Sequence, residues 1–395
     1  MKIRAIIGSS WGDEGKGRMV DYFADDETIV VRFNGGAQAG HTVIDSAGNR
    51  HAFRHFGSGT FKGASTYLSK FFIVNPILFA MEYNELITKH GTANSVYVSP
   101  HCFVTTPWDM LINTIIEKER GNGRHGSCGC GINETVVRSG GGMLLNVQLL
   151  LSDHLDDLVR HIQQDHVKSR LDELMIDPGE KYSILLKSEN IFNNFMRDVE
   201  VFKNKIIPMD PKFKDYKGVI FEGAQGLMLD QNHENFPHVT PSNTGLQNVQ
   251  HLMDDFHLHD DIDVTYVTRS YATRHGAGPF PNEDPEMSYE DETNVPNEHQ
   301  GDLRFGLLDI DSLVLEISKD MSKMRIPFNP SIAVTCLDQH SGQCVMDGVE
   351  IFPSHEDLCK HILADRLNFS KAYGGYGPKT NDHMSTWERK VDYAF

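Results

Sequence analysis

The segment GSSWGDEGKG, residues 8–17, combines glycines, one lysine and two carboxylates directly after a short apolar run. Backbone N–H groups at the start of a helix, together with the ammonium group of Lys16, are suited to binding phosphate. The segment does not match the motif G-x-x-x-x-G-K-[ST], because Ser10 stands at the first glycine position and Gly17 at the hydroxyl position. It is therefore a candidate phosphate site of another type.

Asp13 is an unusual residue in such a loop, because its carboxylate would repel a phosphate. A Mg²⁺ ion held by one carboxylate and by phosphate oxygens would remove this repulsion. Alternatively, Asp13 faces a different ligand and acts as a base. A third interpretation is an Asx-type turn at the start of a helix, with no chemical role. The residues of the loop alone leave these three interpretations open.

The elements around this loop alternate between strand and helix patterns. Buried strands are predicted at residues 3–7 and 28–33, and in the runs SVYVSP, GVIFEGAQG, DVTYVTRS and SIAVTCLD. A helix is expected to begin near Lys16, and helical periodicity covers residues 76–90 and 149–173. This order predicts an α/β fold with a large, mostly parallel central sheet, flanking helices and long active-site loops. Functional residues are expected at the carboxyl ends of the strands.

Composition excludes several classes of function. The 395 residues carry a formal net charge of −18, which argues against non-specific binding to nucleic acid, since that needs clustered Lys and Arg. A single nucleotide remains compatible with a local basic pocket. No run approaches the roughly 18 apolar residues of a membrane span, so no membrane association is expected. The six cysteines are too sparse for a disulfide scaffold, which is typical of a cytoplasmic protein.

Several blocks of the chain resemble, in the same order, the motifs of adenylosuccinate synthetases. These blocks are WGDEGKG, RFNGGAQAGHTV, HGSCGCGIN, FEGAQGLMLDQNHENFPHVTPSNT, ATRHGAGPFPNE and VTCLD. The resemblance implies one domain over residues 1–395 and a homodimer. It also implies a ligase that moves the γ-phosphate of GTP onto O6 of IMP in the presence of Mg²⁺. The amine of L-aspartate then displaces this phosphate and gives adenylosuccinate.

The resemblance also assigns roles to residues. It makes Asp13 the base that takes the N1 proton of IMP. It also makes Asp13 a Mg²⁺ ligand, together with the Gly40 carbonyl. His41 would stabilise and protonate at O6, and Gln225 would be the third catalytic residue. The residues implied for GTP are Gly12, Gly15, Lys16, Gly17, Asp338 and Gly377. Those implied for the substrate nucleotide are Gln38, Ser127, Cys128, Arg138, Gln225 and Thr240, and Arg138 would reach a neighbouring subunit's nucleotide.

The chain also departs from the family pattern at three places. Ser127 and Cys128 stand where the family has a Thr-Thr pair, and Cys336 replaces the lysine that stacks on guanine, although Asp338 can still accept from guanine N1 and N2. These residues therefore favour GTP over ATP as the phosphate donor but do not exclude ATP. The amino-acid loop keeps only Arg304, and Arg274 is expected to supply the missing cation for aspartate.

Two rival functions remain. The ending GYGPKTND, residues 375–382, resembles a phage branch that makes 2-amino-2′-deoxyadenylosuccinate from dGMP with ATP or GTP, but retention of Asp13 favours IMP. The second rival is a catalytically idle nucleotide-binding relative. Retention of Asp13 together with Lys16, His41 and Gln225 argues against it. His125, Cys128 and Cys130 lack the spacing and number of ligands that zinc sites use.

Overall fold

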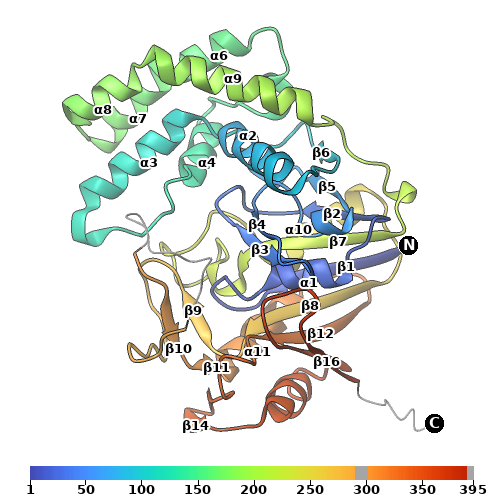
Figure 1. Cartoon of the computed structure of the whole chain (residues 1–395). Coiled ribbons are helices and arrows are strands. Elements are labelled where there is room, and N and C mark those ends of the chain that lie inside the picture. Colours follow the sequence, from blue (N-terminus) through green and yellow to red (C-terminus); the bar gives the residue numbers. More distant parts are fainter. Residues whose placement is uncertain (290–300, 389–395) are drawn as a thin grey trace.

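The computed structural model describes residues 1–289 and 301–388 and is built around a nine-stranded sheet (Figure 1). The strand order is β16-β15-β12-β8-β1-β7-β2-β5-β6. Neighbours from β15 to β6 are parallel, and β15 pairs antiparallel with β16. The strands are β1 (Lys2–Gly8), β2 (Thr28–Arg32), β5 (Ser65–Leu68), β6 (Val96–Val98), β7 (Gly218–Gly226), β8 (Ile262–Arg269), β12 (Phe328–Thr335), β15 (Lys371–Gly375) and β16 (Met384–Glu388). The predicted α/β fold with a mostly parallel sheet is confirmed.

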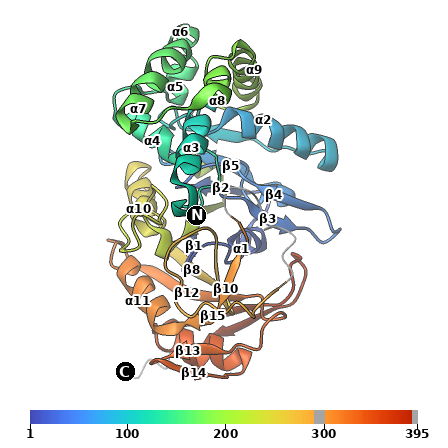
Figure 2. The ribbon, with the colours of Figure 1, turned by 90° about the vertical axis from the view of Figure 1, so that its left-hand side faces the viewer.

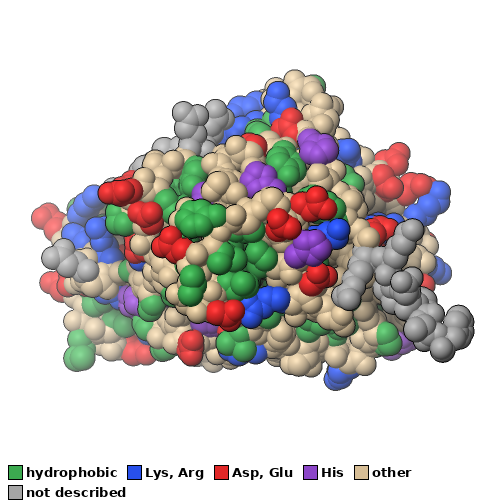
Figure 3. Space-filling view, turned by 90° about the horizontal axis from the view of Figure 1, so that it is seen from below, with side chains coloured by type: hydrophobic (Ala, Val, Ile, Leu, Met, Phe, Trp, Pro, Cys, Tyr) green, Lys and Arg blue, Asp and Glu red, His purple; other side chains and the backbone are tan. Residues whose placement is uncertain are grey.

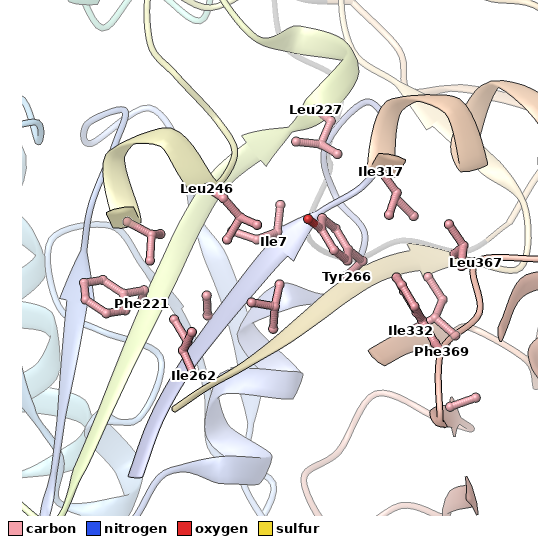
Figure 4. Packing of buried hydrophobic residues seen from close by; sticks show 14 of the residues in the cluster. Ile7, Phe221, Leu227, Leu246, Ile262, Tyr266, Ile317, Ile332, Leu367 and Phe369 are labelled. Carbon is pink, nitrogen blue, oxygen red and sulfur yellow. The ribbon is translucent and has the colours of Figure 1, made fainter. Parts of the chain in front are cut away.

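Helices cover both faces of this sheet, which explains why its central strands are apolar almost throughout. Figure 4 shows the face below α10 (Leu246–Asp255) and α11 (Ile310–Met321), where Ile7, Phe221 and Tyr266 pack with Leu246 and Ile317. The opposite face packs against α1 (Lys16–Phe23), as successive strand side chains point to opposite faces.

A second, mostly helical layer has its own hydrophobic core and lies beyond the β6 end of the sheet, at the top of Figures 1 and 2. The Nε1 group of Trp108 donates a hydrogen bond of 3.0 Å to the Leu186 carbonyl inside this core. Its helices are α2 (Pro76–Glu85), α3 (Pro107–Arg120), α4 (Ile132–Gly140), α5 (Val147–Leu150), α6 (Leu155–His161), α7 (Val167–Leu174), α8 (Gly179–Leu186) and α9 (Glu189–Lys205).

The helix predicted for residues 149–173 is interrupted in the structure. The chain leaves α5 at Leu150 and re-enters a helix at Leu155, and a π-helical turn, Ile162–His166, separates α6 from α7. The hydroxyl of Ser152 donates to the Leu149 carbonyl at 2.7 Å. Such a local bond competes with helix continuation. By contrast, the pattern over residues 76–90 forms α2 followed by a π-helical turn, Leu86–His90.

Short elements complete the molecule. Two hairpins are formed by β3 (His41–Ile44) with β4 (Arg50–Phe53) and by β9 (Ala272–Arg274) with β10 (Arg304–Gly306). A small sheet contains β11 (Leu308–Asp309), β13 (Cys344–Met346) and β14 (Val349–Ile351). The remaining helical turns are Thr60–Lys62, Gly121–Gly123, Phe213–Asp215, Leu227–Leu229 and Asp357–Ala364.

The surface seen from below mixes side chains of every type. Figure 3 shows hydrophobic side chains gathered in the middle of this face, with acidic side chains and histidines around them. Each of the six cysteines is free. Among the helices of the described residues, none has both the length and the apolar composition needed to cross a membrane. The acidic, proline-containing composition of residues 282–302 predicts a long surface loop. Residues 290–300 of it lie outside the described residues.

Candidate active site

The sequence motifs meet at one edge of the sheet, where the parallel strands end. Because β1 lies between β7 and β8, the loops that follow these three strands are neighbours. The segments after β2 and β12 reach the same edge, which is called the carboxyl edge below. A surface groove of about 1150 Å³ opens at the opposite edge, beside Lys2 and Asp263. The motif residues lie away from that groove, so we place the candidate site at the carboxyl edge.

The loop between β1 and α1 is held in shape by Glu14. One oxygen of the Glu14 carboxylate accepts from the backbone N–H of Ser10 at 3.1 Å and of Gly12 at 2.8 Å, and the other pairs with Lys16 Nζ at 2.5 Å. Gly12 and Gly15 have φ values of 95° and 87°, which favour glycine. Glu14 therefore supports the loop from inside, and the two carboxylates of the motif have different roles.

Asp13 points toward the edge of the sheet, and its side chain is 25% exposed. Its Oδ2 atom lies 3.3 Å from Nε2 of His275. The Asp13 carbonyl accepts a hydrogen bond from Nε of Arg269 at 2.5 Å, and its φ of 60° is unusual for a residue other than glycine. Neither His275 nor Arg269 was predicted for the site, although His275 belongs to the block ATRHGAGPFPNE.

His41 is buried and is held by the carboxylate of Glu222, which the sequence did not single out. Nδ1 of His41 lies 2.5 Å from Oε1 of Glu222, and the backbone N–H of Ser58 donates to Oε2 at 3.0 Å. Burial by itself raises the pKa of Glu222, but the charges of Arg32 and His41 and the hydrogen bonds from His41 and Ser58 outweigh burial and lower that pKa to about 2. Glu222 is therefore an ionised acceptor that orients the His41 ring.

His41 also lies against the phosphate-type loop. A Cβ atom at Gly17 would come within 3.0 Å of the His41 Cβ. Burial lowers the pKa of His41, and the Glu222 carboxylate acts in the opposite direction. The structure thus brings His41 to the first turn of α1, as the motif pattern requires.

Two glutamines of the predicted site lie in the same region. Both amide atoms of Gln38 are buried and have no hydrogen-bond partner among the described residues. The Gln225 Oε1 atom lies beside Gly12, because a Cβ atom added to Gly12 would lie 3.2 Å from Oε1. Because buried amides are normally hydrogen-bonded, the unpaired Gln38 amide is available to a polar ligand.

The segment of residues 125–131 packs against the block that contains His275. A Cβ at Gly126 would lie 2.8 Å from the Gly276 Cα. The Ser127 hydroxyl donates to Asn113 Oδ1 at 3.0 Å, and Cys128 and Cys130 are both partly exposed. Burial works against ionisation, but a hydrogen bond from Cys130 lowers the pKa of Cys128 to about 7. The segment that carries Ser127 and Cys128 thus lies against the block that contains His275.

Thr240 follows the extended segment after β7. Its backbone N–H donates to the Leu229 carbonyl at 2.9 Å. The neighbouring Ser242 hydroxyl accepts from the backbone N–H of Gly35 at 3.0 Å, which connects this segment to the loop after β2. Thr240 is partly buried, and the bond of Ser242, two residues further on, ties its segment to the loop that carries Gln38.

The structure does not support the predicted contact of Arg138 with a neighbouring subunit. The Arg138 side chain is fully buried, and its Nε pairs with Oδ1 of Asp109 at 2.9 Å. Its other nitrogens donate to the carbonyls of Met143 at 2.8 Å and Val104 at 2.7 Å. Each of the three guanidinium nitrogens thus has a partner inside the helical layer, which holds the Arg138 side chain there.

The two arginines expected to bind the amino acid are neighbours, because β9 and β10 pair Arg274 with Arg304. Arg274 is buried over the Trp11 ring at 4.2 Å, and burial together with the charge of Arg304 lowers its pKa to about 10. Arg304 is engaged by Glu283, with Nε 2.8 Å from Oε1 and Nη2 2.5 Å from Oε2. A carboxylate substrate would have to compete with Glu283 for Arg304.

The residues predicted for the base of GTP lie at the ends of β12 and β15. Asp338 is exposed, and Cys336 has a φ of 58°. A Cβ at Gly377 would lie 2.4 Å from Oδ2 of Asp382, so this turn requires glycine. Arg18, which the sequence did not single out, ties α1 to this turn through hydrogen bonds to three carbonyls, those of Tyr376, Asp382 and His383.

The donor set of the predicted Mg²⁺ site is compatible with a phosphate-bound ion. Among the described residues, no group of three or more His, Cys, Asp or Glu side chains is arranged to hold a metal. Mg²⁺ is commonly bound by one or two carboxylates together with substrate phosphates and water. The partly exposed carboxylate of Asp13 beside a phosphate-type loop fits that mode, with Gly40 as the predicted carbonyl donor.

The chain is similar in sequence to proteins of one enzyme family. The family model described as adenylosuccinate synthetase matches residues 5–319. The adenylosuccinate synthetase of Mesoplasma florum is 32% identical over 283 residues, which are 70% of this chain and 64% of that protein. The protein of the same name from Dehalococcoides mccartyi is 31% identical over 294 residues, or 72% and 66% of the two chains. The match thus spans slightly less than two thirds of these relatives.

Two solved structures share the fold. Fully ligated adenylosuccinate synthetase from Plasmodium falciparum has a TM-score of 0.68 and 20% identity, covering 97% of this chain and 99% of that one. Succinoaminodeoxyadenylate synthetase of cyanophage S-2L, bound to dGMP and dATP, has a TM-score of 0.57 and 15% identity, covering 98% and 95%. At these identities the likeness concerns the fold alone.

Proposed function

The chain belongs to the adenylosuccinate synthetase family, and we propose that it is a purine nucleotide ligase that joins IMP to L-aspartate. In this proposal GTP first phosphorylates O6 of IMP, and the aspartate amine then displaces the phosphate. The observation that carries the proposal is the placement of Asp13 and of the Glu222-bound His41 beside one phosphate-type loop. We also propose that residues 1–395 act as one domain, as a homodimer, in the cytoplasm.

The first step concerns the proton on N1 of IMP. Asp13 accepts this proton, which makes O6 a better nucleophile. Its partly exposed carboxylate is accessible at the carboxyl edge. The Glu222 carboxylate stabilises the His41 ring when both nitrogens are protonated, so Nε2 can donate to O6 while charge develops there. Gln225 and the unpaired amide of Gln38 position the nucleotide.

Phosphoryl transfer depends mainly on positioning and on positive charge. Backbone N–H groups of Gly15 and Gly17 and the ammonium group of Lys16 are proposed to bind the GTP phosphates. Gly12, whose own N–H donates to Glu14, is proposed to shape the loop around these phosphates. Lys16 pairs with Glu14 in the structure, so it is already held at this loop. When bound by Asp13 and the Gly40 carbonyl, Mg²⁺ would neutralise phosphate charge.

Further residues are proposed for the base of GTP, for the amino acid and for the substrate nucleotide. Asp338 and Gly377 are proposed to read guanine, so GTP is expected, and ATP is the alternative. Arg304 and Arg274 are proposed to bind the carboxylates of aspartate, although Glu283 engages Arg304. Ser127, Cys128 and Thr240 are proposed to contact the substrate nucleotide.

One alternative is 2-amino-2′-deoxyadenylosuccinate synthesis from dGMP, aspartate and ATP or GTP. The cyanophage synthetase bound to dGMP and dATP shares its fold with this chain, so the fold is compatible with this alternative. The other alternative is an idle relative that binds nucleotides without turnover. Adenylosuccinate is the product of the proposed IMP reaction alone, because the dGMP reaction gives 2-amino-2′-deoxyadenylosuccinate and the idle relative gives no product.

A product assay separates these functions. The protein is incubated with Mg²⁺, with GTP or ATP, with IMP, GMP or dGMP, and with several amino acids, and the products are identified by mass spectrometry. Adenylosuccinate formed from IMP and aspartate would support the proposal. A product formed only from dGMP would replace it with the first alternative. Nucleotide binding without phosphate release in any mixture would favour the second.

A further inference from the structure

Arg54 occupies a position at the candidate site that no sequence motif indicated. It directly follows β4, and its backbone N–H donates to Oε1 of the buried Glu82 at 2.8 Å. Its side chain extends toward the loop after β2, where Nη1 donates to the Ala37 carbonyl at 3.2 Å. A Cβ at Gly40 would lie 3.8 Å from the Arg54 Cζ. The guanidinium group therefore borders the loop that carries Gln38.

The same guanidinium group also acts on the segment of residues 125–131. The hydrogen bond from Cys130 is the main cause of the low pKa of Cys128, and the charge of Arg54 acts in the same direction. For Cys130, the hydrogen bond to Cys128 and burial raise the pKa, and Arg54 opposes them. Arg54 thus lies within electrostatic range of both thiols and between two loops that the proposed function assigns to the substrate nucleotide.

The charge of Arg54 is not balanced by a carboxylate. Among the ion pairs of the described residues, Arg138 pairs with Asp109 and Arg304 pairs with Glu283, whereas no pair includes Arg54. Its side chain is partly exposed, and its Nη1 bond to the Ala37 carbonyl uses one of the five N–H donors of the guanidinium group. A partly buried cation of this kind is suited to an anionic ligand.

We propose that Arg54 binds the 5′-phosphate of the purine nucleotide substrate. An arginine can donate two parallel hydrogen bonds to a phosphate. The unpaired amide of Gln38 lies on one loop that flanks Arg54 and can complete the contacts. The hydroxyl of Ser127, on the other loop, can join them by exchanging its bond to Asn113 Oδ1 for one to the phosphate. The phosphate-binding cation is then supplied by the same chain that carries Asp13 and His41, and Arg138 is not needed for it. This inference rests on the proposed function for the identity of the nucleotide.

The test compares nucleotides with nucleosides in equilibrium binding to the full-length protein. The affinities of IMP, GMP, dGMP and inosine are measured by calorimetry for the wild type, Arg54→Ala and Arg54→Lys. Loss of a charged hydrogen-bond donor should weaken binding of the monophosphates by about 10- to 100-fold in Arg54→Ala. Binding of inosine should be unchanged, and Arg54→Lys should retain part of the monophosphate affinity.

A matched control removes another arginine of the same hairpin. Arg50→Ala on β4 should leave all affinities within about twofold, and circular dichroism should show that both alanine variants are folded. Equal weakening of IMP and inosine, unchanged monophosphate affinity in Arg54→Ala, or a wild type that binds none of the monophosphates would overturn the proposal. Because binding is read without turnover, a protein that binds but does not form adenylosuccinate would refute the proposed function and leave the role of Arg54 intact.

Discussion

The carboxylate of Glu222 lies 2.5 Å from Nδ1 of His41, and the two residues are 181 positions apart in the sequence. Glu222 is fully buried in the middle of β7, level with Arg32 at the end of β2, and His41 begins the hairpin strand β3. The contact fixes the orientation of the imidazole and stabilises its protonated form. Glu222 therefore orients His41 for its proposed role at the reacting oxygen.

Replacing Glu222 with Gln tests this relationship. The amide keeps the shape of the side chain but removes the charge that stabilises protonated His41, so we expect kcat for nucleotide turnover to fall by at least about tenfold. The KM for each substrate should change little, because Glu222 acts through His41. Steady-state kinetics check this expectation. Ser58→Ala, which removes only one hydrogen bond to Glu222, should have a smaller effect, and an unchanged kcat in Glu222→Gln would contradict the role.

The Asp13→Asn variant tests the proposed base. Asparagine keeps the size of the side chain but cannot accept the N1 proton, so turnover should fall by at least about 10²-fold. Phosphate release and product formation are measured together, and thermal unfolding shows whether the fold is kept. Near-normal rates in a folded variant would remove Asp13 from the chemistry.

Replacing either member of the ion pair between Arg304 and Glu283 should change the KM for aspartate, in opposite directions for the two residues. Arg304→Ala should raise the aspartate KM by the equivalent of about 1.5–3 kcal/mol, because a charged hydrogen bond is lost. Glu283→Gln should lower that KM, because the competing carboxylate is removed. Initial rates over a range of aspartate concentrations check both, with the nucleotide KM values as the control. If a neutral amino acid is the better substrate, the aspartate assignment fails.

Cys128 should react with alkylating agents at a lower pH than an ordinary cysteine. Its pKa is lowered to about 7 by the hydrogen bond from Cys130, and the thiolate is the reactive form. The rate of alkylation by iodoacetamide should therefore rise through pH 7 and level off above it, as followed by mass spectrometry. Cys128→Ser serves as the control, and IMP should slow the reaction. A rate that still rises steeply above pH 8 would contradict the low pKa.

Local patterns in the sequence determined much of the architecture. The apolar run before residue 8 and the glycines and Lys16 after it predicted a strand, a loop and a helix, and the structure has β1 and α1 at these places. The alternation of strands and helices also predicted the parallel sheet and, through it, the edge at which the motifs meet. These features depend on side-chain periodicity and backbone preferences, which neighbouring residues set.

The partners of the functional side chains were decided only by the tertiary structure. Strand order places β7 between β1 and β2, and β8 on the other side of β1. The first neighbourhood brings Glu222 to His41, which follows β2, and the second brings His275 to Asp13. Packing of α3 against α4 buries Arg138 against Asp109, while the turn after β4 places Arg54 at the site. A charged side chain has no periodic signal for its partner, because its contacts depend on which elements pack together over long sequence separations.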